Sequence, residues 1–104
     1  MTSVVFFETE QGLTGFEISG HSGAGESGYD IVCSAISSAA IMAANTLTEI
    51  LQLGAKQEVE EGRLYIEVSQ IPKAQDILRG LELHLKELQA QYPKNLTVSY
   101  RRKK

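Results

Sequence analysis

The chain contains five short stretches that predict β-strands, most of them β-branched, aromatic or alternating between hydrophobic and polar residues. The clearest alternation places Leu64, Ile66 and Val68 on one face of a half-buried strand. Turn residues at Gln11-Gly12 and at Gly62 separate neighbouring strands and indicate hairpins. The predicted strands are residues 4–8, 13–19, 57–61, 63–69 and 96–100.

Two longer segments have helical patterns that differ in their polar faces. The second begins at Pro72, and its leucines recur along one stripe opposite charged residues. The first covers residues 30–53 and has no charge between Asp30 and Glu49. We expect Asp30 to be its N-cap and Gly54 to take the left-handed position that ends it. A helix that is apolar nearly all round needs cover from the sheet and also from the second helix or a partner subunit.

The order of these elements, β-β-α-β-β-α-β, predicts an α+β fold. We expect a mixed five-stranded sheet packed with two helices. A length of 104 residues, 42% of them hydrophobic, suits one compact domain over residues 1–104. The last four residues, 101–104, are all basic and are expected to form a tail.

The uncharged part of the first helix has about the length of a membrane span. Six hydroxyl or amide side chains interrupt it, and several alanines dilute its hydrophobicity. We therefore interpret it as the buried centre of a domain and expect no membrane partner. The interrupting residues are Ser34, Ser37, Ser38, Asn45, Thr46 and Thr48.

Composition and charge argue against several classes of function. The formal net charge is −3, so we do not expect direct nucleic-acid binding. The basic tail has two interpretations: it could contact RNA, or it could simply keep the end of the chain solvated. One cysteine and two histidines are too few for a closed zinc site, and we expect no metal or cofactor. The first residues lack a basic group and a long apolar run, which argues against a signal peptide. A free thiol then fits the reducing cytoplasm.

The candidate chemistry lies between the second predicted strand and the first helix. Residues 20–29 include four glycines and predict a mobile loop, in which His21 lies. Cys33 follows twelve residues later, at the third helical position if Asp30 is the N-cap. Free amides and the helix dipole favour a thiolate there, and the same amides can hold an oxyanion. His21 and Cys33 are therefore candidates for a catalytic base and nucleophile.

Each of these residues also has a structural interpretation. A cysteine in an alanine-rich helix is commonly a small buried hydrophobe, and a histidine after glycine is commonly a turn residue. Asp30 either caps the helix or orients His21. Ser37, one turn after Cys33, either hydrogen-bonds into the site or permits close packing. Gly20 is expected to supply an unusual backbone angle before His21.

The loop glycines Gly23, Gly25 and Gly28 also spell G-x-G-x-x-G, the pattern of a dinucleotide-binding turn. The first of them lies too far past the strand, and the expected acidic residue falls near Glu49, inside the helix. The chain also lacks the alternating β-α-β series of that fold, and no Gly-Lys-Ser/Thr follows to form a phosphate loop. We therefore expect no nucleotide cofactor.

The segment from Gly20 to Ser37 resembles the signature of the ribosomal-processing cysteine proteases, the Prp family. The shared elements are Gly-His at 20–21, a loop that ends in Gly-x-Asp at 28–30, Ile-Val-Cys at 31–33, and a serine four positions later. The length and element order of the whole chain also resemble that family. The family often has other residues at Gly25, Ser27 and Tyr29, so details of substrate docking do not carry over.

The resemblance implies a small cytoplasmic bacterial endopeptidase, a hydrolase that is usually homodimeric. It implies removal of the N-terminal extension of a large-subunit ribosomal protein, the L-twenty-seven type, during ribosome maturation. His21 and Cys33 match the family's catalytic pair. The positions that match its supporting residues are Gly20, Asp30 and Ser37. The expected substrate loop includes Ser22, Gly23, Gly25 and Gly28.

Two other functions stay open at the level of the sequence. A non-enzymatic ribosome-assembly or ribosomal-protein-binding factor would use a groove and the basic tail and would not depend on Cys33. A thiol redox sensor would oxidise Cys33 reversibly, but the chain has no second cysteine to resolve the oxidised form. Blocking Cys33 with a thiol reagent separates the protease from the binding factor.

Overall fold

The computed structural model describes residues 1–20 and 27–103, and it confirms the α+β fold with the predicted element order. The strands begin or end within one or two residues of the predicted bounds. The one additional element is a five-residue π-helix, η1, after the first helix. The bounds are β1 (Thr2–Thr9), β2 (Gly12–Ser19), α1 (Ser27–Asn45), η1 (Thr46–Ile50), β3 (Ala55–Glu60), β4 (Arg63–Val68), α2 (Ile71–Gln91) and β5 (Leu96–Arg102).

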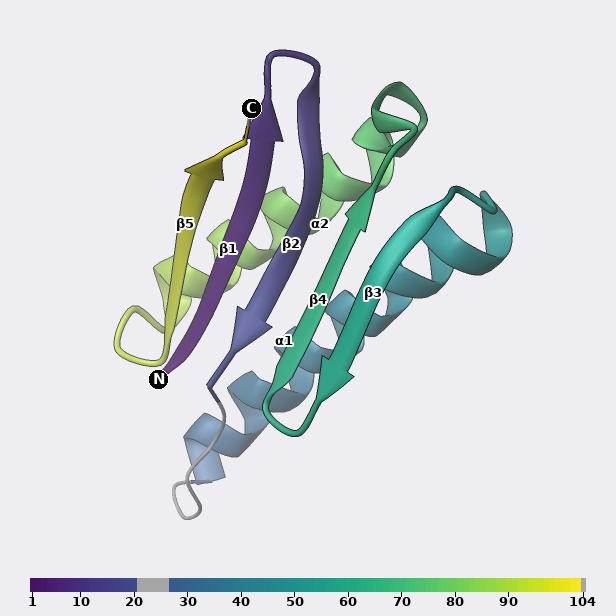
Figure 1. The fold of residues 1–104 in the computed structure, drawn as a ribbon. Helices are drawn as coiled ribbons and strands as arrows, with labels where there is room; N and C mark the ends of the chain where they lie inside the picture. Colours follow the sequence, from purple (N-terminus) through teal and green to yellow (C-terminus); the bar gives the residue numbers. More distant parts are fainter. Residues whose placement is uncertain (21–26, 104) are drawn as a thin grey trace.

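The five strands form one mixed sheet in the order β3-β4-β2-β1-β5. β1 and β5 pair in parallel, and the other neighbours pair antiparallel. Both helices lie on the same side of the sheet, so the molecule has two layers (Figure 1). The first and last strands of the chain are thus neighbours, which fixes the start of β1 between β5 and the end of β2.

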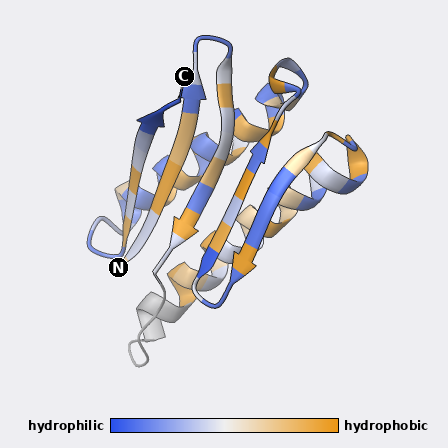
Figure 2. Cartoon of the chain, in the orientation of Figure 1, coloured by the Kyte–Doolittle hydropathy of each residue, from blue (hydrophilic) through white to orange (hydrophobic). Residues whose placement is uncertain are grey.

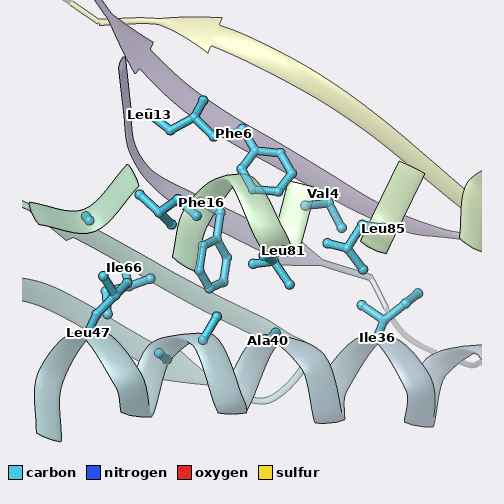
Figure 3. Packing of buried hydrophobic residues seen from close by; sticks show 14 of the residues in the cluster. Val4, Phe6, Leu13, Phe16, Ile36, Ala40, Leu47, Ile66, Leu81 and Leu85 are labelled. Carbon is cyan, nitrogen blue, oxygen red and sulfur yellow. The ribbon is translucent and has the colours of Figure 1, made fainter. Parts of the chain in front are cut away.

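Alternate residues of the central strands fill the space between the sheet and the helices. The rings of Phe6 and Phe16 are fully buried, with centroids 6.2 Å apart, at the centre of this core (Figure 3). Hydrophobic residues recur along the strands and helices that contribute to this core (Figure 2). The fully or nearly fully buried residues of the helices are Val32, Ile36, Ala40, Ala43, Ala44, Leu47, Ala74, Leu78, Leu81 and Leu85.

The opposite face of the sheet carries polar and aromatic side chains that cover one another. The Tyr65 hydroxyl donates a hydrogen bond to Glu67 at 2.6 Å, and this bond together with burial raises the pKa of Tyr65 to about 12. Phe7, only 1% exposed, packs beside Tyr65 and beneath the ammonium of Lys103. Arg63 pairs with three glutamates of the two neighbouring strands, Glu17 of β2 and Glu58 and Glu60 of β3. These side-chain contacts therefore cover the aromatic surface of this face, so that it needs no further layer of helices or strands.

The end of α1 differs from the prediction of one helix that runs to residue 53. The hydroxyls of Thr46 and Thr48 donate to carbonyls one turn earlier, at 2.8 and 3.1 Å, and so compete with the backbone for those acceptors. The Leu51 amide reaches back five residues to the Thr46 carbonyl, which gives the π-turn. The left-handed residue is Gln52, with φ of 52°, so the prediction that Gly54 takes this position is wrong.

The basic end of the chain is also different from its prediction as a tail. Arg101 and Arg102 continue β5, paired in parallel with Phe7 and Glu8 of β1. The Lys103 amide then donates to the Glu8 carbonyl at 2.7 Å. Backbone pairing with β1 therefore extends through residues that their charge alone marked as a solvated end.

The exposed side of α1 carries large apolar side chains among small polar ones. The window Ile31–Ile50 is long and apolar enough to cross a membrane by length and composition, but its other face packs in the core of this domain. Ile31, Ile41 and Met42 are 65%, 54% and 54% exposed. α2 lies beside α1 without covering these three side chains. The sequence predicts that the sheet and a second element both cover this helix, and α2 supplies only part of that second contact.

Candidate active site

The chain's single cysteine lies on α1 and faces the first strand. Cys33 is half-buried. Its Sγ lies 3.6 Å from Oγ1 of Thr2, the first residue of β1, within hydrogen-bond distance for sulfur. The two residues are 31 positions apart in the sequence, so tertiary packing rather than local chain geometry brings them together.

Thr2 is held firmly by the sheet. Its amide donates to the Asn95 carbonyl at 2.9 Å, and it pairs with Leu96 at the start of the parallel β1–β5 ladder. Its side chain is only 3% exposed. A hydroxyl in such a place keeps one position, because both the backbone and the surrounding packing fix it.

Gly20 closes the same corner from the side of β2. Its φ is +82°, a left-handed conformation that glycine adopts readily, as the sequence predicts for this position. A Cβ at Gly20 would lie 2.5 Å from the Met1 carbonyl oxygen, so a side chain has no room there. The pairing of Ser3 with Ser19 places this glycine opposite Thr2. Gly20 thus packs directly against the strand start that contacts Cys33.

Several predicted site residues fall outside the part of the chain that the structure describes. These are His21, Ser22, Gly23 and Gly25. The pairing of His21 with Cys33 therefore remains a prediction. Gly20, which precedes His21 in the sequence, and Cys33 on α1 both lie beside the start of β1.

The start of α1 corrects the prediction about the helix cap. The helix begins at Ser27, so Gly28 and Asp30 lie in its first turn, and Asp30 is not the N-cap. Cys33 follows six residues after that start, in the second turn rather than at the third helical position. Amides there are already bonded within the helix, and the dipole effect fades beyond the first turn. The predicted oxyanion donors beside Cys33 are therefore not available from this helix.

Ser37 lines a groove on the surface of the domain. Ser37 is exposed and lines, together with Gly20, a cavity of about 360 Å³ between α1 and the β3–β4 hairpin. The apolar part of its lining includes Ile18, Ile41, Val59 and Leu64. Such a groove can receive an extended, partly apolar chain. Residues from four separate segments form it, so no local pattern indicates it.

Sequence reasoning also missed Thr2. A threonine at the start of a predicted strand has no distinctive signal, and only tertiary packing brings it against α1. Within residues 1–20 and 27–103, no three histidine, cysteine or acidic side chains come together in a way that could hold a metal ion. The expectation that the protein needs no cofactor stays a prediction.

The fold is similar to that of several solved structures. The ribosomal processing protease Prp of S. aureus, crystallised with a substrate peptide, has a TM-score of 0.87 at 23% identity, with 97% of this chain and 100% of that chain covered. The same protease with a covalently linked product peptide gives 0.85 at 24% identity, with the same coverage. A Streptococcus mutans protein gives 0.82 at 25% identity, with 99% and 96% covered. A comparison with curated protein sequences found no significant match.

The family comparison goes further than the fold. The model of the family described as cysteine protease Prp matches residues 1–97, nearly the whole chain. The match includes Cys33, the one cysteine that the sequence offers to a protease of this class. The chain therefore belongs to the Prp family of cysteine proteases.

Proposed function

We propose that this protein removes the N-terminal extension of a large-subunit ribosomal protein of the L-twenty-seven type, with Cys33 as nucleophile and His21 as its acid–base partner. One observation carries the proposal: a chain of a cysteine-protease family has a single cysteine, and that cysteine lies within the Gly-His to Ile-Val-Cys motif. The S. aureus protease of the same fold has been seen with a substrate peptide and with a covalently linked product peptide.

The proposed reaction is acyl transfer through a thioester. The Cys33 thiolate attacks the scissile carbonyl carbon, and a C–S bond forms while the carbonyl oxygen gains the charge. His21, protonated by the thiol, returns that proton to the leaving amine as the C–N bond breaks. Water, deprotonated by His21, then cleaves the thioester and restores the thiol. Because α1 begins at Ser27, the oxyanion donors lie elsewhere than on the turn that carries Cys33.

The groove beside Cys33 supports an extended peptide as substrate. Its lining includes Ser37, one turn after Cys33 on α1, and mixes apolar residues with Glu60 and Arg63. An extended segment laid along β3 and α1 would place its scissile bond near the start of β1. Burial of apolar substrate side chains in the groove would supply binding free energy at about 25 cal/mol per Å².

We also propose that two copies of the protein form a homodimer through the exposed face of α1. Ile31, Ile41 and Met42 lie on it, and no charged residue occurs between Asp30 and Glu49 to oppose contact with an identical surface. We place the enzyme in the cytoplasm, where ribosomal proteins assemble and a lone thiol stays reduced.

The test of the proposed function is mass spectrometry of the extended ribosomal protein before and after incubation with this protein. We expect one new product that lacks the extension, and none after the enzyme has been blocked with iodoacetamide. The matched controls are the same ribosomal protein without its extension, which should stay intact, and a His21→Ala variant, which should cleave at least about a hundredfold more slowly. An intact precursor after prolonged incubation with unmodified enzyme would refute the proposal.

A further inference from the structure

The Thr2 hydroxyl of the first strand lies within hydrogen-bond distance of the sulfur of Cys33 on α1. Thr2 Oγ1 lies 3.6 Å from Cys33 Sγ, and Thr2 is 3% exposed. We propose that Thr2 is a positioning residue for the nucleophile: its hydroxyl donates a hydrogen bond to the Cys33 sulfur and holds it in one orientation. This inference rests on the proposed role of Cys33.

The backbone around Thr2 makes it suitable for this task. The Asn95 carbonyl accepts its amide hydrogen on the side of β5, and Met1 packs against Gly20 on the side of β2. The first strand is thus clamped between the last strand and the glycine that precedes His21. A displacement of Thr2 would require a break in the parallel ladder or a shift of Gly20. The backbone contacts therefore hold the hydroxyl in a fixed position beside Cys33.

The hydroxyl also compensates for what the helix does not offer. Cys33 lies beyond the first turn of α1, where backbone amides are engaged and the dipole is weak. A donor aimed at sulfur binds the thiolate more strongly than the thiol, because hydrogen bonds to charged acceptors are the stronger ones. Thr2 thus holds the sulfur and fixes the direction from which it attacks.

Packing is a competing role for Thr2, and valine separates it from the hydrogen bond. Valine has nearly the same shape as threonine but lacks the donor, so Thr2→Val removes the hydrogen bond and keeps the filling of the corner. Thr2→Ser keeps the donor and removes a methyl group. Thr14 offers a matched control, because it is also 3% exposed and its hydroxyl bonds Glu67 on the far face of the sheet.

The experiment measures the rate of iodoacetamide alkylation of Cys33 between pH 5 and 10, followed by intact mass. We expect Thr2→Val to lower the rate at neutral pH about threefold to tenfold, because the sulfur loses a hydrogen-bond donor. Thr2→Ser should stay within about twofold of the unmodified protein, and Thr14→Val should overlay it. On the cleavable precursor, Thr2→Val should lower kcat by a similar factor with little change in KM.

Two results would overturn the proposal: a Thr2→Val profile that overlays that of the unmodified protein, or a folded Thr2→Ser variant as slow as Thr2→Val. If Thr2→Val does not fold, the pair Thr2→Ser and Thr2→Ala repeats the comparison, since those variants differ only by the hydroxyl. Alkylation needs no substrate, so a failed cleavage assay refutes the proposed function without deciding the role of Thr2.

Discussion

The two helices lie side by side on one face of the sheet, yet they use their surfaces differently. α2 buries one stripe that includes Leu78 and Leu85, and turns charged residues such as Arg79 outward. α1 also buries a stripe but turns Ile41 and Met42 to its outer side. Cys33 lies at the edge of the buried stripe, half-exposed. The hydrophobic residues of α2 mostly serve the core, whereas α1 also carries large hydrophobic residues outside the core. We propose that this outer side of α1 mediates association and that the edge carrying Cys33 mediates catalysis.

The largest expected difference between the helices concerns catalysis. Cys33→Ala should lower precursor cleavage by about a thousandfold or more, since the nucleophile is lost. His84→Ala, at an exposed position of α2, should leave kcat/KM within about twofold. Steady-state cleavage assays on both folded variants test this. Equal losses in the two would remove the distinction between a catalytic and a structural helix.

The second difference concerns stability. Leu78→Ala leaves a cavity beneath α2, because this side chain is fully buried, and should lower the free energy of unfolding by about 2–5 kcal/mol. Leu83→Ala, on the exposed side of the same helix, should change it by less than about 0.5 kcal/mol. Urea denaturation followed by circular dichroism gives both values. A loss below about 1 kcal/mol for Leu78→Ala would mean that the core does not depend on α2 as described.

The third difference concerns association. Met42→Glu should raise the dissociation constant of the proposed homodimer more than tenfold, because it places a charge in an apolar interface. Leu83→Glu introduces the same charge on the exposed face of α2, where Leu83 is 61% exposed, and should leave association unchanged. Sedimentation velocity over a concentration series measures both. A protein that stays monomeric at micromolar concentration would contradict the proposed use of the α1 surface.

The smallest expected effect lies on the polar side of α2. Burial alone would raise the pKa of Glu82, but hydrogen bonds from Tyr100 and Arg79 hold it below its usual value. A carboxylate with a lowered pKa stabilises the folded state above the ordinary carboxyl range, and this contribution disappears as the pH falls through the folded pKa. Tyr100→Phe should therefore cost about 1 kcal/mol at pH 7 and less at pH 3, as measured by denaturation. An equal cost at both pH values would contradict this origin.

The regular elements could be predicted because their patterns are local. Leu64, Ile66 and Val68 alternate as a half-buried strand must, and the leucines of α2 keep helical spacing. The start of α1 could not be placed in the same way. Asp30 satisfies the capping rule, and Gly28 is a poor helix residue, yet the helix includes both. Near a helix start the local preferences are weak enough for neighbouring packing to override them.

The residues of the candidate site also differ in whether the sequence alone could predict them. Cys33 and Gly20 belong to a contiguous motif, so the sequence could indicate them. Thr2 and the groove beside Ser37 depend on which strands become neighbours. The parallel pairing of β1 with β5 joins the two ends of the chain, and no periodicity reports such a contact. The role of the basic residues 101–103 was missed for the same reason.

Covalent labelling with a peptide chloromethyl ketone, whose sequence ends at the observed cleavage site, tests the nucleophile most directly. The thiolate displaces chloride from such a reagent and forms a stable thioether, which peptide mapping by mass spectrometry can locate. We expect one equivalent of label per chain, on Cys33, and protection by an excess of the uncleaved precursor. An enzyme that still cleaves the precursor fully while Cys33 carries the label, or that is inactivated with Cys33 unlabelled, would contradict the central role assigned to this residue.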